Sequence, residues 1–358
     1  MRASRFVLVW ALFAASPAFA ADGALSPREI YEGACASCHG NDGRGAPDSG
    51  VNVPLPDFSD CRMVTAENDG NWHYLLLHGG QSFGLSSQMP AFEGILSSEQ
   101  IDQVIDYIRS FCTDASWPHG DLNFRRALIT SKAFPEDEFL IKPEFEKGRD
   151  RTRDWVTEMS LERRVGRRGQ VEVSLPFAAH DITHGPTTAG LGDVTLAYTH
   201  VLYANRFSAT IVAAALDLGL PTGDYHRNLG AGTVNFGPSL LLGQRLGPIV
   251  FQGQIRGDAP IDENRADRSV SYNLAFSYPF SSIKRDWVPT VEIEALQDVS
   301  TSQHHLFITP EIYKGLTRRG HVAVALGAQI PVAGDADPFD VRVLAFFLWE
   351  YSDGGLWW

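Results

Sequence analysis

The sequence predicts a multidomain protein in which a small all-α domain precedes an all-β antiparallel barrel of about 12 strands. Its 358 residues exceed what one hydrophobic core usually organises. Apolar residues recur at helical spacing in the first third of the chain, and from about residue 139 they alternate with period two. We therefore expect an α-domain over residues 22–113, a linker over 114–138 and a β-domain over 139–358.

Residues 1–20 have the layout of a secretory signal peptide. Basic residues precede an apolar stretch over residues 6–15, and the small-residue site Ala18-Phe19-Ala20 follows a Ser-Pro pair. The apolar stretch is about half of the roughly 20 residues that a membrane-spanning helix needs. We expect cleavage near Ala20 and export of the rest of the chain.

The segment Cys35-Ala36-Ser37-Cys38-His39 is the C-x-x-C-H motif of covalent c-type haem attachment. In such a motif two thiols bond the macrocycle, and the adjacent imidazole is placed on one face of the iron. A redox-active C-x-x-C needs no adjacent His, and a structural zinc site needs a second ligand pair at suitable spacing. The motif predicts one covalently attached c-type haem, held by Cys35, Cys38 and His39.

The second axial ligand of the iron is expected to be Met89, in the segment Gln88-Met89-Pro90. Met63 is the alternative sulfur ligand. His73 and His78 fall in an apolar helical stretch and are expected to be ordinary helix residues. A bis-His iron would have a lower reduction potential than a His/Met iron.

Two helices are predicted to flank the haem motif. Ser26-Pro27 reads as an N-cap followed by Pro at the first helical position. Ser97 and Gln100 resemble a capping box, and apolar residues at helical spacing follow them. In the order of these features, the stretch resembles class I cytochromes c.

That resemblance implies a set of residue roles. His39 and Met89 would be the axial ligands of the iron, and Cys35 and Cys38 would form the thioether bonds. Tyr31 would pack near Tyr107 where the terminal helices cross. The Pro47 carbonyl would orient His39 by accepting a hydrogen bond from its free ring N–H.

Cys61 and Cys112 remain after the haem motif is assigned. In an oxidising periplasm they are expected to form a disulfide that closes a 51-residue loop. Thiol redox chemistry or a second metal site is the alternative.

Charge restricts the partners of this protein. The formal net charge of −13 argues against nucleic acid and anionic lipid as partners. Between Ala21 and Pro118 acidic residues greatly outnumber arginines, and lysine is absent. We expect a basic periplasmic redox protein that is steered electrostatically to this domain. A merely solvated acidic surface is the alternative.

The β-domain has the alternation of a membrane barrel. Runs such as 170–178, 269–281 and 320–332 alternate apolar with small or polar residues over a length that crosses a bilayer when the strand is tilted. The apolar faces are rich in aromatic residues. The opposite faces carry charged residues and predict a wet, charged lumen: Glu158, Glu162, Arg164, Arg256, Glu292, Glu294 and Arg342. A soluble β-sandwich is the alternative.

Connections between the predicted strands alternate between short and long. Short ones follow the even strands, which is typical of an outer-membrane barrel with both termini in the periplasm. The sequence thus predicts an outer-membrane protein whose haem domain lies in the periplasm.

Two short segments give the barrel a further resemblance. Leu220-Pro221-Thr222-Gly223-Asp224 and Gly237-Pro238-Ser239-Leu240 resemble an outer-membrane transporter family named for phenol-degradation pathways. By its domain order the whole chain is similar to the fused cytochrome-porins of iron-oxidising bacteria, although those have larger barrels.

The predicted function is electron transfer by a single haem at the periplasmic mouth of a barrel, in exchange with a soluble partner. One alternative is a transporter for a small solute in the barrel lumen, with the haem as sensor or gate. Another is an oxidoreductase acting on Fe(II) or another small donor. A six-coordinate His/Met iron has no open position for a substrate, so an electron carrier is favoured over an enzyme.

Overall fold

The structure, a computed structural model, describes residues 25–149, 152–181, 187–335 and 339–353. The predicted signal peptide lies outside these residues. The helical part of the chain consists of α1 Pro27–Ala34, α2 Ala36–His39, α3 Cys61–Val64, α4 Asp69–His78, the 3₁₀ turn η1 Gly80–Phe83, α5 Ser98–Arg109 and the 3₁₀ turn η2 Gly120–Leu122. No helix among the described residues is long and apolar enough to cross a membrane.

The predicted helix starts are present. Ser26 and Glu29 form a capping box at the start of α1, and Ser97 and Gln100 form one at the start of α5. The two helices pack against each other, and the ring centroids of Tyr31 and Tyr107 lie 5.3 Å apart. Because caps and hydrophobic periodicity are local signals, the sequence predicted both elements.

The rest of the chain forms one closed antiparallel barrel. Its strands are β1 Glu138–Lys147, β2 Arg153–Val165, β3 Gly169–Asp181, β4 Thr188–Leu191, β5 Val194–Asn205, β6 Thr210–Leu220, β7 Asn235–Leu246, β8 Ile249–Pro260, β9 Ser269–Ser277, β10 Trp287–Asp298, β11 His304–Gly315, β12 Val322–Gly334 and β13 Val341–Glu350. Apart from β4 and β5, which do not pair with each other, each strand pairs with its sequence neighbours, and β1 pairs with β13 to close the sheet. The short β4 and then β5 pair with successive parts of the same strand β3 and together count as one strand of the wall. The barrel therefore has 12 strands around its circumference, as predicted.

The alternation of side chains across the barrel wall also agrees with the prediction. Val173, Tyr272 and Leu326 are about half exposed on the outer surface. Inward-facing polar side chains such as Glu162 and Glu292 are almost fully buried. An apolar outer band with a polar interior is the arrangement of an outer-membrane barrel.

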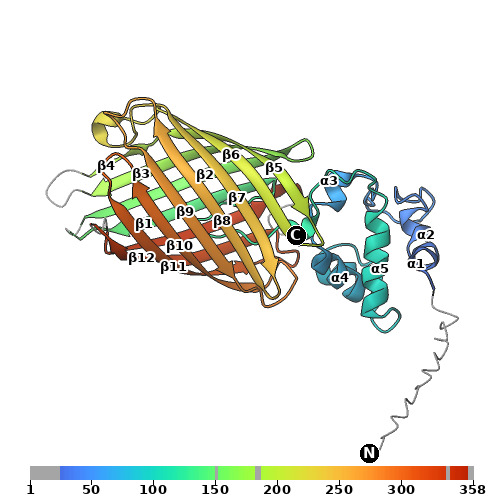
Figure 1. Ribbon diagram of the computed structural model, residues 1–358. Coiled ribbons are helices and arrows are strands. Elements are labelled where there is room, and N and C mark those ends of the chain that lie inside the picture. The colour runs from blue at the N-terminus through green and yellow to red at the C-terminus, as the bar shows by residue number, and fades with distance from the viewer. Residues whose placement is uncertain (1–24, 150–151, 182–186, 336–338, 354–358) are drawn as a thin grey trace, which may run out of the picture.

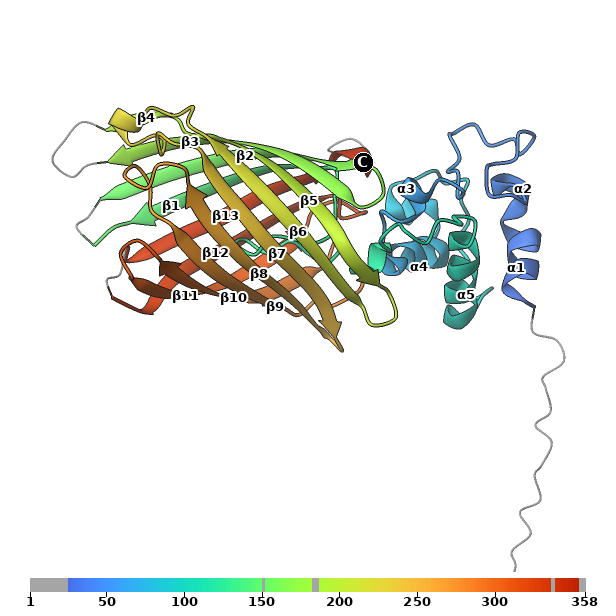
Figure 2. The same cartoon turned by 45° about the horizontal axis from the view of Figure 1, so that its top comes forward.

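The helical domain lies at the end of the barrel where the short turns are (Figures 1 and 2). In both views α3 and α4 lie next to the barrel, and α1 and α2 lie on the side of the domain away from it. The haem motif, which begins at Cys35 directly after α1 and includes all of α2, therefore lies on the side of the domain away from the barrel.

The sequence analysis expected a linker over residues 114–138. The second half of this segment lies inside the barrel, which the sequence analysis did not foresee. Residues 122–137, here called the plug, leave the helical domain at η2 and contact inward-facing side chains of strands on several sides of the barrel. Leu122, Phe124, Phe134 and the adjoining strand residue Leu140 are all less than 5% exposed. The lumen at this end is therefore filled with protein, contrary to the expectation of a water-filled lumen throughout.

Candidate haem site

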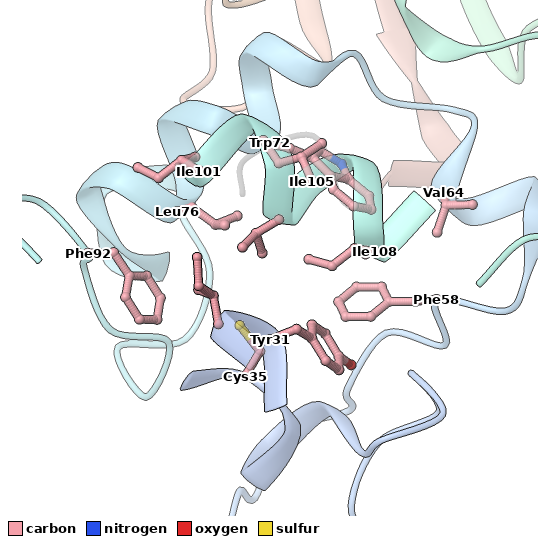
Figure 3. Packing of buried hydrophobic residues seen from close by; sticks show 12 residues of the cluster. Tyr31, Cys35, Phe58, Val64, Trp72, Leu76, Phe92, Ile101, Ile105 and Ile108 are labelled. Carbon is pink, nitrogen blue, oxygen red and sulfur yellow. The ribbon is translucent and has the colours of Figure 1, made fainter. Parts of the chain in front are cut away.

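The helices of the small domain enclose one cluster of apolar side chains, called the pocket below. Figure 3 shows Tyr31 and Cys35 from the α1 side opposite Leu76, Ile105 and other side chains of α4 and α5. Cys35 is buried and Cys38 is partly exposed, and both are free thiols. The cluster therefore contains the first predicted attachment thiol, and the second lies three residues further along the chain.

His39 is positioned by the packing of its ring. It is 9% exposed, and its ring stacks on Phe58 with the centroids 4.9 Å apart. Phe58 in turn contacts Trp72, at a centroid distance of 5.9 Å. Burial lowers the pKa of His39, which favours the neutral imidazole that a metal ion requires.

A tight loop after α4 presents Met89 to the same pocket. The backbone N–H of Gly80 donates to the Met89 carbonyl at 3.0 Å, and the N–H of Phe92 donates to the Leu76 carbonyl at 3.0 Å. A Cβ atom at Gly80 would lie 2.2 Å from the Ser86 carbonyl oxygen, so only glycine fits there. Met89 packs against the apolar cluster that contains Cys35.

The hydrogen bond expected between His39 and Pro47 is not formed. The Nδ1 atom of His39 is buried and has no hydrogen-bond partner among the described residues. The loop nearby is instead held through Gly45 and Ala46, whose N–H groups donate to the carbonyls of His39 and Cys38. The His39 imidazole, two free thiols and the Met89 sulfur lie in or beside this apolar cluster, and these are the groups that hold a c-type haem, so the residues fit this cofactor.

The alternative ligands of the iron have other contacts. His73 lies 2.6 Å from Asp102, and His78 lies 3.5 Å from Glu93. Both histidines thus face polar partners at the domain surface, as expected of ordinary helix residues. Met63 packs against the apolar cluster from α3.

Cys61 and Cys112 form the expected disulfide, with the sulfur atoms 2.05 Å apart. The bond joins α3 to the segment that follows α5. Arg62, next to Cys61, also forms an ion pair with Asp137 at the end of the plug, at 2.7 Å. The disulfide therefore lies on the side of the domain that contacts the barrel.

Basic turns of the barrel hold the helical domain. Arg206 pairs with Asp106 at 2.7 Å, and Arg167 pairs with Asp114 at 2.7 Å. The Arg285 guanidinium donates to the Tyr74 hydroxyl at 2.9 Å and lies over its ring. Much of the negative charge on this face of the domain is thus balanced by the barrel. The sequence analysis missed this role of the basic turns.

Asn71 joins α4 to two of these turns. Its Oδ1 accepts a hydrogen bond from the Lys284 N–H at 2.9 Å, and its Nδ2 donates to the Arg319 carbonyl at 3.2 Å. The side chain is 1% exposed. Because a buried amide group that loses its partners is costly, Asn71 specifies how the domain is seated.

His119 lies in the same interface, where the chain leaves the helical domain. Its Nε2 is 3.5 Å from the Arg206 guanidinium and 3.9 Å from the Asp69 carboxylate. Burial, and then the nearby positive charge of Arg109, lower the pKa of His119 to about 4. The imidazole is therefore neutral near pH 7.

The base of the plug is fixed by buried ion pairs. Arg126 bridges Glu138 and Glu162 at 2.8 and 2.6 Å, and Lys132 bridges Glu136 and Glu138 at 2.9 and 3.0 Å. Glu162 was expected to face water in the lumen, but it contacts the plug. This network combines side chains from the plug and from two strands, which no local sequence pattern reveals.

Comparisons with known proteins agree with the two-part fold. Residues 22–108 match the family model described as cytochrome c oxidase, cbb3-type, subunit III. No curated protein matches the chain.

The barrel resembles solved outer-membrane structures. An outer membrane channel from Pseudomonas putida F1 aligns with a TM-score of 0.50 and 13% identity, over 63% of this chain and 99% of that one. The KdgM porin aligns with a TM-score of 0.42 and 9% identity, over 60% and 99% of the two chains. The NanC porin gives 0.42 and 8%, over 59% and 98%. At this identity the likeness to the Pseudomonas channel shows the fold alone. The chain thus joins a domain that matches a cytochrome c oxidase subunit family to a closed 12-stranded barrel with the fold of an outer-membrane channel.

Proposed function

We propose that this protein is an outer-membrane-anchored electron carrier with one covalent c-type haem. Cys35 and Cys38 form the thioether bonds, and His39 and Met89 are the axial ligands. The haem iron supplies one-electron chemistry when it is bound. This assignment is supported by the apolar pocket and by the donor atoms that line it.

The residues of the pocket have separate tasks in this proposal. Phe58 fixes the orientation of the His39 ring by stacking on it. The loop from Gly79 to Phe92 holds the Met89 sulfur against the pocket and excludes water from it.

One observation carries the choice of an electron carrier: the haem motif lies on the face of the domain away from the barrel (Figures 1 and 2). A soluble protein reaches this face directly. The plug and the helical domain both lie between the haem motif and the lumen. Oxidation of Fe(II) or another small donor inside the lumen therefore receives no support from the geometry.

The proposed partner is a basic periplasmic redox protein. Acidic residues between 25 and 60 outnumber the arginines there, and no described residue of this stretch forms an ion pair with the barrel. Free negative charge around the haem motif favours a positively charged partner. The periplasmic position proposed for the domain is supported by the predicted signal peptide and by the short turns at this end of the barrel.

A reduced-minus-oxidised spectrum of the protein from outer membranes tests the haem assignment. We expect one haem per chain and a Met-to-iron charge-transfer band that is lost in Met89→Ala. Met63→Ala is the matched control, because Met63 packs against the same cluster, and it should keep the band. A native protein without this band, or with an iron that binds added ligands, would overturn the His39/Met89 assignment.

A further inference from the structure

Residues 128–130, here called the tip of the plug, form hydrogen bonds with two carboxyl groups of the barrel wall. The N–H of Leu128 donates to Glu311 at 2.9 Å, and the N–H groups of Ile129 and Thr130 donate to the two oxygens of Glu292 at 2.8 and 2.7 Å. Both glutamates are at least nine-tenths buried. Glu292 lies near the middle of β10, so the plug reaches about half of the height of the barrel.

These two carboxyl groups have no positive partner. They lie on the neighbouring strands β10 and β11, and neither forms an ion pair with a described residue. Oε1 of Glu311 is buried without a hydrogen-bond partner among the described residues. The Thr309 hydroxyl, across the strand pair from Glu292, and the Thr130 hydroxyl of the plug have no hydrogen-bond partner in the described structure.

The tip therefore differs from the base of the plug. The base is fixed by ion pairs through Arg126 and Lys132, whereas the tip is held by backbone hydrogen bonds to one carboxyl pair. Buried polar groups that remain unsatisfied are costly, so the tip gains less from its position than the base does. The tip is the part that leaves most easily.

Two glycines in the barrel wall make room for the plug. A Cβ atom at Gly327 would lie 2.6 Å from Cδ1 of Leu128, and one at Gly243 would lie 2.9 Å from Cδ2 of Phe124. The wall is thus shaped around this segment. A Cβ atom at Gly327 would also lie 2.9 Å from Cβ of Glu311, so a larger side chain there would press on the carboxyl pair as well as on the tip. A larger side chain at Gly243 would displace the plug at Phe124 and would not meet either glutamate.

Beyond the tip the lumen is lined by charged side chains. Carboxylates outnumber cations among them: Glu144, Glu146, Glu158, Asp217, Asp258 and Glu294 against Lys142, Arg256 and Arg342. A charged wall is the lining of a water-filled channel, and an excess of negative charge favours cations. A barrel that served only as an anchor would not need such a lining.

From these contacts we propose that the plug is a gate, that Glu292 and Glu311 are its latch, and that the opened barrel conducts small cations. This activity goes beyond electron transfer and does not depend on the redox partner. Withdrawal of the tip leaves a path lined by the charged side chains of the far half of the barrel.

Conductance of the full haem-containing chain in planar lipid bilayers, with KCl on both sides, tests the gate. The native protein is expected to stay mostly closed. The double variant Glu292→Ala/Glu311→Ala removes every acceptor of the Leu128, Ile129 and Thr130 N–H groups, so we expect at least a tenfold rise in mean conductance. Glu144→Ala is the matched control, because it removes a luminal carboxylate without a hydrogen bond to the plug, and it should stay closed.

Gly243→Leu displaces the plug at Phe124, away from the carboxyl pair, and decides the question if the double variant does not fold. Its folding is checked by heat-modifiable migration and by the haem spectrum. A reversal potential in a KCl gradient should show a preference for K⁺ over Cl⁻ in the open variants. A native chain that is permanently open, folded variants that stay closed, or a preference for Cl⁻ would overturn the proposal.

Discussion

The two faces of the haem domain differ in how their acidic side chains are balanced. On the face that contacts the barrel, Asp106 and Asp114 pair with arginines of the turns. On the opposite face lie α1 and α2 with the haem motif, and no described acidic residue between 25 and 60 forms an ion pair with the barrel. One face therefore provides attachment to the barrel, and the other remains free for a mobile partner.

The largest effect is expected from removal of the haem, which should change the free face and leave the attachment of the barrel-facing side unaffected. Cys35→Ser combined with Cys38→Ser should abolish covalent haem, because no thiol remains to form a thioether bond. The barrel should still fold, since its strands do not contact these cysteines. Haem staining and heat-modifiable migration of the same gel band measure both results, and loss of the folded barrel would contradict the separation.

The next largest effect is expected at the disulfide on the barrel-facing side. Cys61→Ser/Cys112→Ser opens a 51-residue loop. In the loop-entropy model this lowers the free energy of unfolding by about 4 kcal/mol. Denaturant titration followed by the haem absorbance measures it. An unchanged midpoint would show that the barrel alone holds this side of the domain.

Substitution of Asn71 tests how the helical domain is attached to the barrel turns. Asn71→Ala leaves the Lys284 N–H and the Arg319 carbonyl without their partner, which costs about 1–3 kcal/mol. Limited proteolysis between residues 113 and 121 should become faster. The control Asn52→Ala, at an exposed position with no hydrogen bond to the barrel, should be cut at the native rate.

The pH dependence of the interface follows from His119. Since its pKa is about 4 in the folded protein and near 6.5 when unfolded, the unfolded chain binds the proton more readily between these values. Stability from the neutral imidazole is complete above pH 6.5 and is lost as the pH falls toward 4. Proteolysis of the interface should therefore accelerate over this range. His119→Gln should make the proteolysis rate less dependent on pH. An unchanged dependence would show that His119 is not its cause.

The smallest effect is expected on the free face. Asp48→Lys reverses one charge close to Pro47, and it should slow reduction by a basic cytochrome about two- to threefold at low salt. At high salt the variant and the native protein should converge, because screening removes the steering. Glu263→Lys makes the same charge change at the opposite end of the barrel and should have no effect.

Local patterns account for what the sequence could predict. Capping boxes defined α1 and α5, alternation defined the barrel strands, and the C-x-x-C-H motif located the pocket. The plug was assigned to a linker because its apolar residues follow no period. Its partners are remote in sequence: Leu128 bonds to a residue 183 positions away, and Thr130 to one 162 positions away. Charged residues such as Arg126 would ordinarily indicate solvent, but here they face carboxylates inside the barrel.

Both ends of the plug leave the barrel through the same mouth. It begins at η2 beside Asp69 and ends at β1 beside Arg62, and both of these residues belong to the helical domain. Withdrawal therefore requires no strand to separate and no chain end to thread through the barrel. If the ion pairs of Arg126 and Lys132 and those between the domain and the turns also broke, residues 113–137 would become a tether of at most roughly 80–90 Å when fully extended. A haem domain on such a tether could leave the membrane surface and meet partners deep in the periplasm.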